Sequence, residues 1–173
     1  MKTASLVRAS IGALALTVLA GCGGTATFTI EETFTIDGVG NIDETLNINL
    51  ADLAGDAWDH RDKIKDAKIT AATAIVTEEY GNNTADTVSG AVTLSGAGGA
   101  VTFAEGTNVA IADNAVYAVE NGNLGPLADT IKSSLKGNGQ MELTTLGTVA
   151  PGGAATHIDV TVLIDVEVEW SVF

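Results

Sequence analysis

The sequence predicts an all-β fold, an antiparallel β-sandwich with one short helix. Apolar and polar residues alternate along residues 25–37 and again along residues 155–172. A period of two is typical of a strand with one face in a core. Between these segments, short β-rich pieces follow one another at regular spacing and no long helical pattern occurs. Many short strands separated by turn residues indicate a sandwich.

The first alternating segment has one irregular position. Its even positions are apolar from Ala26 to Ile36, except for Glu32, and its odd positions are mostly threonine. A carboxylate on an inward face is costly unless the strand bulges or lies at a sheet edge. The sequence therefore predicts a bulge or an edge position at Glu32.

The last segment is unusually long for one strand. Fully extended, residues 155–172 span roughly 59 Å at about 3.3 Å per residue. We therefore expect this segment to bend or to pass from one sheet to another. Its outward row of Asp165, Glu167 and Glu169 predicts an exposed acidic stripe that discourages pairing at an edge.

Seven further strands and one helix complete the prediction. The strand candidates are residues 41–50, 67–79, 88–95, 100–104, 107–112, 115–120 and 139–149, with turn residues at 81–83, 96–99, 105–106 and 113–114. Residues 126–136 predict the helix, because Pro126 begins it, Leu127, Ile131 and Leu135 recur every four residues, and Gly137 ends it. Residues 51–66 predict a crossing loop with a helical turn, anchored by Leu53, Trp58 and Ile64.

The N-terminus carries the pattern of an export signal. Lys2 and Arg8 precede an apolar run of 13 residues, which is too short to span a bilayer as a helix. The run ends in Leu19-Ala20-Gly21-Cys22, which resembles the lipobox of bacterial lipoproteins. The resemblance implies cleavage after residue 21, lipidation of Cys22 and a single mature domain over residues 22–173. Gly23, in the pattern of Gram-negative bacteria, favours the outer membrane.

The charge of the mature part limits its partners. Residues 22–173 contain six basic and 22 acidic residues, a formal charge of −16. Such a charge repels nucleic acid and anionic lipid headgroups. The acidity has two open explanations, adaptation to salt and cation binding. Because Cys22 is the only cysteine, the mature domain has no disulfide and no thiol chemistry.

Oxygen-bearing side chains gather in the predicted turn after residue 36. Asp37, Asn41, Asp43 and Glu44 are weak candidates for calcium ligands. The EF-hand spacing is absent, and an acidic hairpin turn explains the same residues. We therefore predict neither a metal nor a cofactor.

Two further groups of polar residues bear on function. His60 lies among Asp56, Asp59 and Asp62, where a solvated loop is favoured over a metal site. Trp58 and His60 are weak candidates for a binding surface. Carboxylates two residues apart on one strand face lie about 7 Å apart, but nothing apolar on that face would keep one of them protonated. We therefore expect no enzymatic activity.

The stretches Leu50-Ala51-Asp52-Leu53 and Asp62-Lys63-Ile64-Lys65-Asp66-Ala67-Lys68-Ile69 precede a threonine-rich strand. Over residues 25–80 the chain resembles uncharacterised cell-envelope lipoproteins of Bacteroidetes-like genomes. The resemblance implies an immunoglobulin-like sandwich held at the envelope. The expected function is a non-enzymatic structural or protein-interaction role. The alternative is binding of a small ligand or glycan, with an aromatic cluster near Trp58 or Tyr80, and the last candidate is a carboxylate hydrolase.

Overall fold

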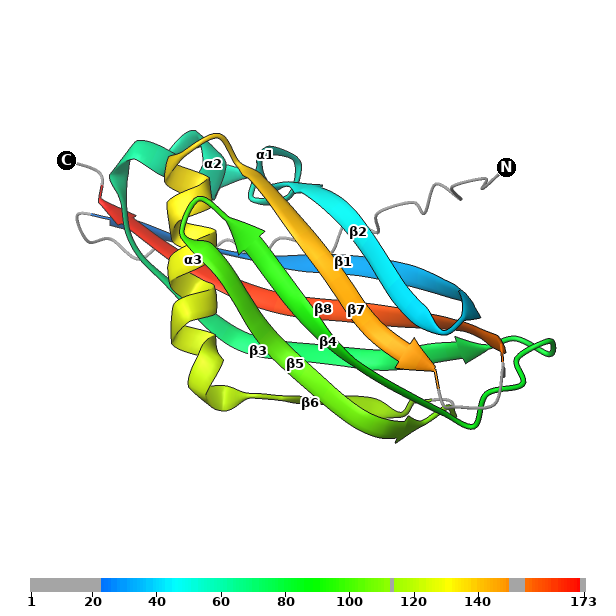
Figure 1. Ribbon diagram of the computed structural model, residues 1–173. Helices are drawn as coiled ribbons and strands as arrows, with labels where there is room; N and C mark the ends of the chain where they lie inside the picture. The colour runs from blue at the N-terminus through cyan, green and yellow to red at the C-terminus, as the bar shows by residue number, and fades with distance from the viewer. Residues whose placement is uncertain (1–22, 113, 150–154, 172–173) are drawn as a thin grey trace.

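The computed structural model describes residues 23–112, 114–149 and 155–171 (Figure 1). The strands in this part are β1 (Gly23–Val39), β2 (Asn41–Asn49), β3 (Ile64–Glu79), β4 (Thr87–Gly96), β5 (Gly99–Ala110), β6 (Val116–Val119), β7 (Gln140–Val149) and β8 (Ala155–Ser171). The helical elements are α1 (Leu50–Leu53), α2 (Asp56–Asp59), η1 (Arg61–Lys63), η2 (Asn121–Asn123) and α3 (Leu124–Lys136). Cys22 and the predicted export signal lie outside the described residues.

The strands form one continuous antiparallel sheet in the order β1-β8-β3-β6-β5-β4-β7-β2. The pairing is nested, because β1 pairs with β8, β2 with β7, β3 with β6 and β4 with β5. This is the order of a jelly roll, in which a long hairpin of strand pairs rolls into two layers. Figure 1 shows a back layer of β1, β8 and β3 and a front layer of β5, β4, β7 and β2.

The all-β, antiparallel part of the prediction is confirmed, but the immunoglobulin-like arrangement is wrong. In an immunoglobulin sandwich the first two strands are neighbours in one sheet. Here β1 and β2 lie at opposite ends of the strand order, and the chain passes between them at Gly40, whose φ is 86°. Because a positive φ allows an abrupt turn, the chain leaves one layer and enters the other after a single residue.

The longest alternating segment stays in one layer. β8 pairs with β1 without a register shift, from Gly23↔Ser171 to Val39↔Ala155, and it pairs with β3 on its other side. Of the two predicted outcomes, a bend or a change of sheet, the change of sheet is therefore wrong. The predicted edge role of its acidic row is also wrong, because β8 lies between β1 and β3. The short strand β6 links the layers instead, since Tyr117 lies opposite Ala74 of β3 and Val119 lies opposite Ala104 of β5.

Glu32 lies on an edge strand, as predicted. β1 is the first strand in the sheet order, and its regular pairing with β8 excludes a bulge at Glu32. The side chain is half-buried, and desolvation together with neighbouring Glu31 raises the pKa of its carboxyl. The edge position lets this carboxylate keep part of its contact with water.

Glu105 and Gly106 do not form the predicted turn. The two strand candidates on either side of them are one strand, β5. Register shifts between Val88 and Gly90 and between Val92 and Thr93 allow β4 and β5 to stay paired. A Cβ at Gly106 would lie 2.7 Å from a ring carbon of buried Tyr117. Close packing against Tyr117, and not a turn, therefore requires glycine at position 106.

Helix α3 covers one end of the sandwich (Figure 1). Leu127, Ile131 and Leu135 are fully buried, so the predicted apolar stripe is confirmed, although the helix begins at Leu124 rather than Pro126. The crossing segment contains the short helices α1, α2 and η1, and Ile64 is buried where β3 begins. Among the described helices, none is long and apolar enough to cross a membrane.

Candidate functional site

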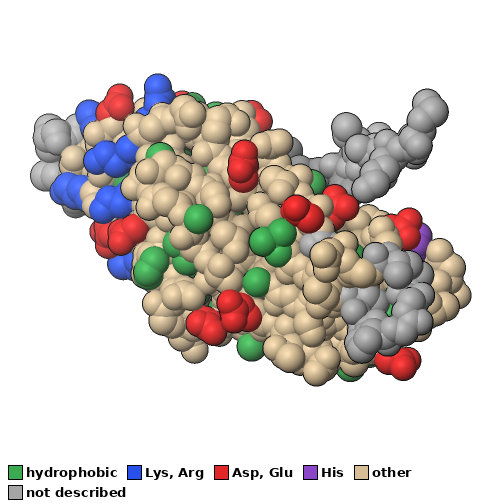
Figure 2. Space-filling view, in the orientation of Figure 1, with side chains coloured by type: hydrophobic (Ala, Val, Ile, Leu, Met, Phe, Trp, Pro, Cys, Tyr) green, Lys and Arg blue, Asp and Glu red, His purple; other side chains and the backbone are tan. Residues whose placement is uncertain are grey.

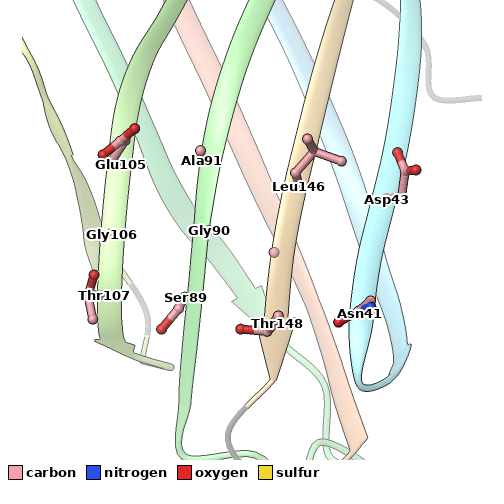
Figure 3. A pocket seen from close by; sticks show the side chains of 11 residues that line it. Asn41, Asp43, Ser89, Gly90, Ala91, Glu105, Gly106, Thr107, Leu146 and Thr148 are labelled. Carbon is pink, nitrogen blue, oxygen red and sulfur yellow. The ribbon is translucent and has the colours of Figure 1, made fainter.

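The outer face of the front layer carries a shallow groove of about 610 Å³. Figure 3 shows the strands that form it, β5, β4, β7 and β2. The groove is lined by Asn41, Asp43, Ser89, Gly90, Ala91, Glu105, Gly106, Thr107, Leu146, Gly147 and Thr148. Its volume lies in the range of ligand sites in proteins.

The groove side chains form two rows across the strands. The sheet register places Glu105, Ala91, Leu146 and Asp43 side by side on β5, β4, β7 and β2. Ala91, in the middle of this row, has a short side chain, and Leu146 beside it is 50 % exposed.

The second row lies nearer the β1–β2 turn. Ser89, Thr148 and Asn41 are opposite one another in register, and Thr107 stands beside Ser89 in Figure 3. The groove thus has an exposed apolar centre surrounded by hydroxyl, amide and carboxylate groups.

Three glycines lie in register between the two rows. Gly90 is opposite Gly106 on one side and Gly147 on the other. A Cβ at Gly90 would lie 2.7 Å from the Leu146 carbonyl oxygen, and one at Gly147 would lie 2.7 Å from the Ser89 carbonyl oxygen. The backbones of β4 and β7 therefore approach so closely here that only glycine fits.

The polar side chains of the groove are largely unengaged within the protein. In the described part of the chain, no hydrogen bond or ion pair involves the side chains of Asn41, Asp43, Glu105, Thr107 or Thr148. Ser89 is the exception, because its hydroxyl accepts a bond of 2.8 Å from the Asn108 N–H. These groups are therefore available to a bound molecule.

The outer face of the back layer contains the same residue types in a bonded state. Thr29 donates to Asp165 at 2.6 Å. The hydroxyl of Thr161 lies 3.0 Å from that of Thr33 and 2.9 Å from that of Thr77. These five side chains satisfy one another, so they offer less to a ligand. Thr27, Glu31 and Thr35 on the same face have no side-chain hydrogen bond within the described residues.

The two groove acids are too far apart for catalysis by a carboxylate pair. Glu105 on β5 and Asp43 on β2 are separated by β4 and β7. Three strand spacings place them about 14 Å apart. Glycosidase pairs lie about 5–9.5 Å apart.

The acidic row proposed for a hydrolase is engaged with neighbouring side chains. Asp165 accepts from Thr29, and Lys68 lies 3.8 Å from Glu167 and 3.2 Å from Glu169. The Glu169 carboxylate raises the pKa of Lys68 through its hydrogen bond. None of these three carboxylates lines the groove on the front layer.

The four weak calcium candidates do not converge. Asn41 and Asp43 line the groove, whereas Glu44 follows Asp43 on a strand and points to the opposite side. Asp37 lies 3.4 Å from Nδ1 of His157. Within residues 23–112, 114–149 and 155–171, no group of three or more His, Cys, Asp or Glu could hold a metal ion.

Trp58 and His60 lie away from the groove, at the end of the sandwich that α3 covers. The Arg61 guanidinium lies 4.5 Å from the Trp58 ring centre, and His60 stacks on Trp170 at 5.0 Å. Tyr80 lies at the opposite end, against His157 at 4.4 Å. The aromatic residues named for the glycan alternative are thus divided between the two ends.

The sequence interpretation missed most of the groove. Asn41 and Asp43 were named, but only as calcium candidates, and Glu105 and Gly106 were assigned to a turn. Glycine inside a strand pattern marks a close approach of a ligand or another backbone. Gly90 and Gly147 carried that signal within the strand candidates 88–95 and 139–149.

Comparisons with known proteins do not assign the chain to a family. No protein-family model matches the chain, and no curated protein matches it. Among solved structures, a chain titled Desmodium yellow mottle tymovirus is similar with a TM-score of 0.42 and 15 % sequence identity. The match covers 94 % of this chain and 96 % of that chain. The jelly-roll assignment rests on the strand order alone.

Proposed function

We propose that this chain is a lipid-anchored cell-envelope protein with a non-enzymatic interaction role, and that the front-layer groove receives its partner. The contrast between the two outer faces carries the proposal. Five polar side chains around the groove have no partner in the described protein, whereas Thr29, Thr33, Thr77, Thr161 and Asp165 in the middle of the back layer are bonded to one another. A polar surface left open beside an exposed leucine is suited to binding.

The chemistry of the groove favours an extended, basic partner segment. Asp43 and Glu105 place negative charge at the two sides, and the residues that line the groove include no lysine or arginine. Leu146 offers apolar contact between them. A peptide segment with basic side chains at both ends of a short apolar stretch would match this arrangement.

The position of the groove agrees with an anchor at Cys22. Cys22 directly precedes Gly23, the first residue of β1, whereas Asn41 of the groove follows the far end of the same strand. The 17 residues of β1 extend over about 56 Å at 3.3 Å per residue. The lipobox resemblance implies that the chain is exported to the outer membrane. A lipid at Cys22 would then leave the groove far from the bilayer.

Glycan binding is the second candidate. The hydroxyl, amide and carboxylate groups around the groove favour it, since such groups hydrogen-bond sugars. It ranks second because the residues that line the groove include no aromatic side chain on which a sugar ring could stack.

Site-specific photocrosslinking in intact cells tests the groove. p-Benzoylphenylalanine replaces Ala91 in the groove or, as the matched control, Ala71 on the outer face of β3 in the back layer. We expect a discrete adduct from position 91 that weakens with Asp43→Asn and Glu105→Gln. Equal adducts from both positions, or none from position 91, would contradict a partner in the groove.

Cell fractionation tests the anchor separately. We expect Cys22→Ser to move the chain from the membrane fraction to the soluble fraction, because two or three acyl chains hold firmly and their loss removes the anchor. A Cys22→Ser chain that stays in the membrane fraction would contradict lipidation. If photocrosslinking gives no adduct and a glycan raises the melting temperature of the chain, glycan binding is favoured instead.

A further inference from the structure

Every lysine and arginine of the described protein lies at one end of the molecule, which we call the basic end. The six residues are Arg61, Lys63, Lys65, Lys68, Lys132 and Lys136. They come from η1, the start of β3 and α3, and Figure 2 shows blue side chains gathered at one end of the visible face. Short contacts between α3 and β3 bring them together.

Two contacts hold the lysines of α3 against the start of β3. Nζ of Lys132 lies 3.8 Å from the Asp66 carboxylate. Nζ of Lys136 donates to the Ile64 carbonyl oxygen at 3.3 Å. Residues that are about 70 positions apart in the sequence are thereby brought to one surface.

The charge of the molecule is therefore polarised. Acidic residues also lie at the basic end, where positive and negative charges nearly balance; they include Asp56, Asp59, Asp62, Asp66 and, beside Lys68, Glu167 and Glu169. The opposite end carries acids without any described lysine or arginine. Its acidic residues include Asp37, Asp43, Glu44, Asp86, Glu105 and Asp159.

The basic end is also where the chain meets its proposed anchor. Gly23 pairs with Ser171 of β8, and Ile64 pairs with the adjacent Trp170 on the other side of that strand. Two strand spacings place Gly23 about 10 Å from Ile64. Cys22 precedes Gly23, so a lipid there would hold the basic end at the bilayer surface.

Both tryptophans of the protein lie at this end as well. Trp58 is partly exposed beneath the Arg61 guanidinium, and Trp170 is 7 % exposed beneath His60. Tryptophan beside basic side chains is typical of protein surfaces at the level of lipid headgroups.

We propose that the anchored chain stands end-on, with the basic end against anionic phospholipid headgroups. Arg61, Lys65 and Lys136 contact the headgroup phosphates, and this orientation rests on the proposed lipid at Cys22. A chain lying on its side would bring the acidic end to the same surface, where like charges repel. Standing end-on places that end many Debye lengths away, since the Debye length is about 8 Å at physiological salt.

The uneven distribution of charge changes the prediction about anionic lipid that the total charge gives. A formal charge of −16 predicts repulsion from an anionic bilayer if it is treated as one point. The distribution of the charges leaves the basic end nearly neutral, with Lys65 and Lys136 exposed there, and concentrates the repulsion at the other end. Repulsion then orients the tethered chain instead of detaching it.

Tryptophan fluorescence measures the orientation directly, because both tryptophans report on the basic end. The lipidated chain is inserted into vesicles of phosphatidylcholine, with or without phosphatidylglycerol, that contain a lipid with a nitroxide on its headgroup. We expect stronger quenching in the phosphatidylglycerol vesicles and loss of the difference at high salt. Equal quenching in the two kinds of vesicle would overturn the proposal.

Matched charge variants separate the basic end from the total charge. Lys65→Gln with Lys136→Gln makes the chain more negative by two charges at the basic end. Thr35→Glu with Ala112→Glu does the same at exposed positions of the acidic end. We expect the lysine variant to reduce quenching to the level of phosphatidylcholine vesicles and the control to leave it unchanged or higher. An equal reduction by both variants would overturn the proposal.

Flotation of the same vesicles distinguishes the two proposals. A chain that does not float with vesicles lacks the anchor, which overturns the lipidation and the orientation together. A chain that floats but shows no dependence of quenching on anionic lipid keeps its anchor and refutes only the end-on orientation.

Discussion

The two outer faces of the sandwich are built from similar residues but differ in what those residues do. On the back layer, Thr33, Thr161 and Thr77 form a chain of hydroxyl contacts, and Thr29 donates to Asp165. On the front layer, the groove acids stand on the outer strands with Ala91 and Leu146 between them. Side chains about 5 Å apart on neighbouring strands can pair. The comparison teaches that register, more than composition, decides whether a polar face is closed or open to a partner.

The front layer also closes its polar face outside the groove. Thr93 and Thr102 have hydroxyl oxygens 2.8 Å apart, and those of Thr45 and Thr144 are 3.3 Å apart. These pairs lie in the next outward row beyond Glu105 and Asp43. The open region is therefore local to the groove, where glycine and alanine occupy the central strands.

The largest expected effect concerns the close backbone approach beneath the groove. In Gly147→Ala, the new Cβ would lie 2.7 Å from the Ser89 carbonyl oxygen, and neither backbone can move freely. We expect a loss of roughly 1–3 kcal/mol in the free energy of unfolding, measured by chemical denaturation. Gly122→Ala is the control, since nothing lies within 4 Å of its Cβ position. Equal losses in both variants would show that the approach of β4 and β7 is not tight.

An intermediate effect compares the two faces directly. Thr161→Val removes a hydroxyl that contacts two others, so we expect a loss of about 1 kcal/mol in the free energy of unfolding. Thr148→Val removes an exposed hydroxyl with no described partner and should change stability little. If the two variants lost the same stability, the back face would not be the bonded one.

The smallest expected effect concerns Glu32 on the edge strand. Its raised pKa means that ionisation is less favourable in the folded chain than in the unfolded chain. The wild type therefore loses stability as the pH rises from the ordinary value of 4.5 through the raised one. Glu32→Gln removes this loss, so the variant should melt at a higher temperature than the wild type at neutral pH.

Melting curves over a range of pH check the assignment to Glu32. The advantage of Glu32→Gln should disappear below pH 4.5, where the carboxyl is protonated in both states. Glu44→Gln, at an exposed position of the other edge strand, serves as the control. A gain of equal size in both variants would assign the effect to total charge.

The sequence by itself determined the strands with clear alternation, the position of α3 and the anchoring of the crossing segment. Inward positions of β8 from Ile158 to Val168 are fully buried, as their period of two predicts. Leu127, Ile131 and Leu135 are buried on one side of α3 for the corresponding helical reason. These features depend on residues two to four positions apart, so a local pattern is enough to predict them.

Only the tertiary structure decided which strands are neighbours. Alternation is compatible with many pairings, so it could not show that β8 lies inside a layer between β1 and β3, or that Gly90, Gly106 and Gly147 lie in register. The groove joins four strands, and the basic end joins η1, β3 and α3. Both depend on contacts between residues far apart in the sequence, and the side-chain pattern of a single strand contains no information about its partner.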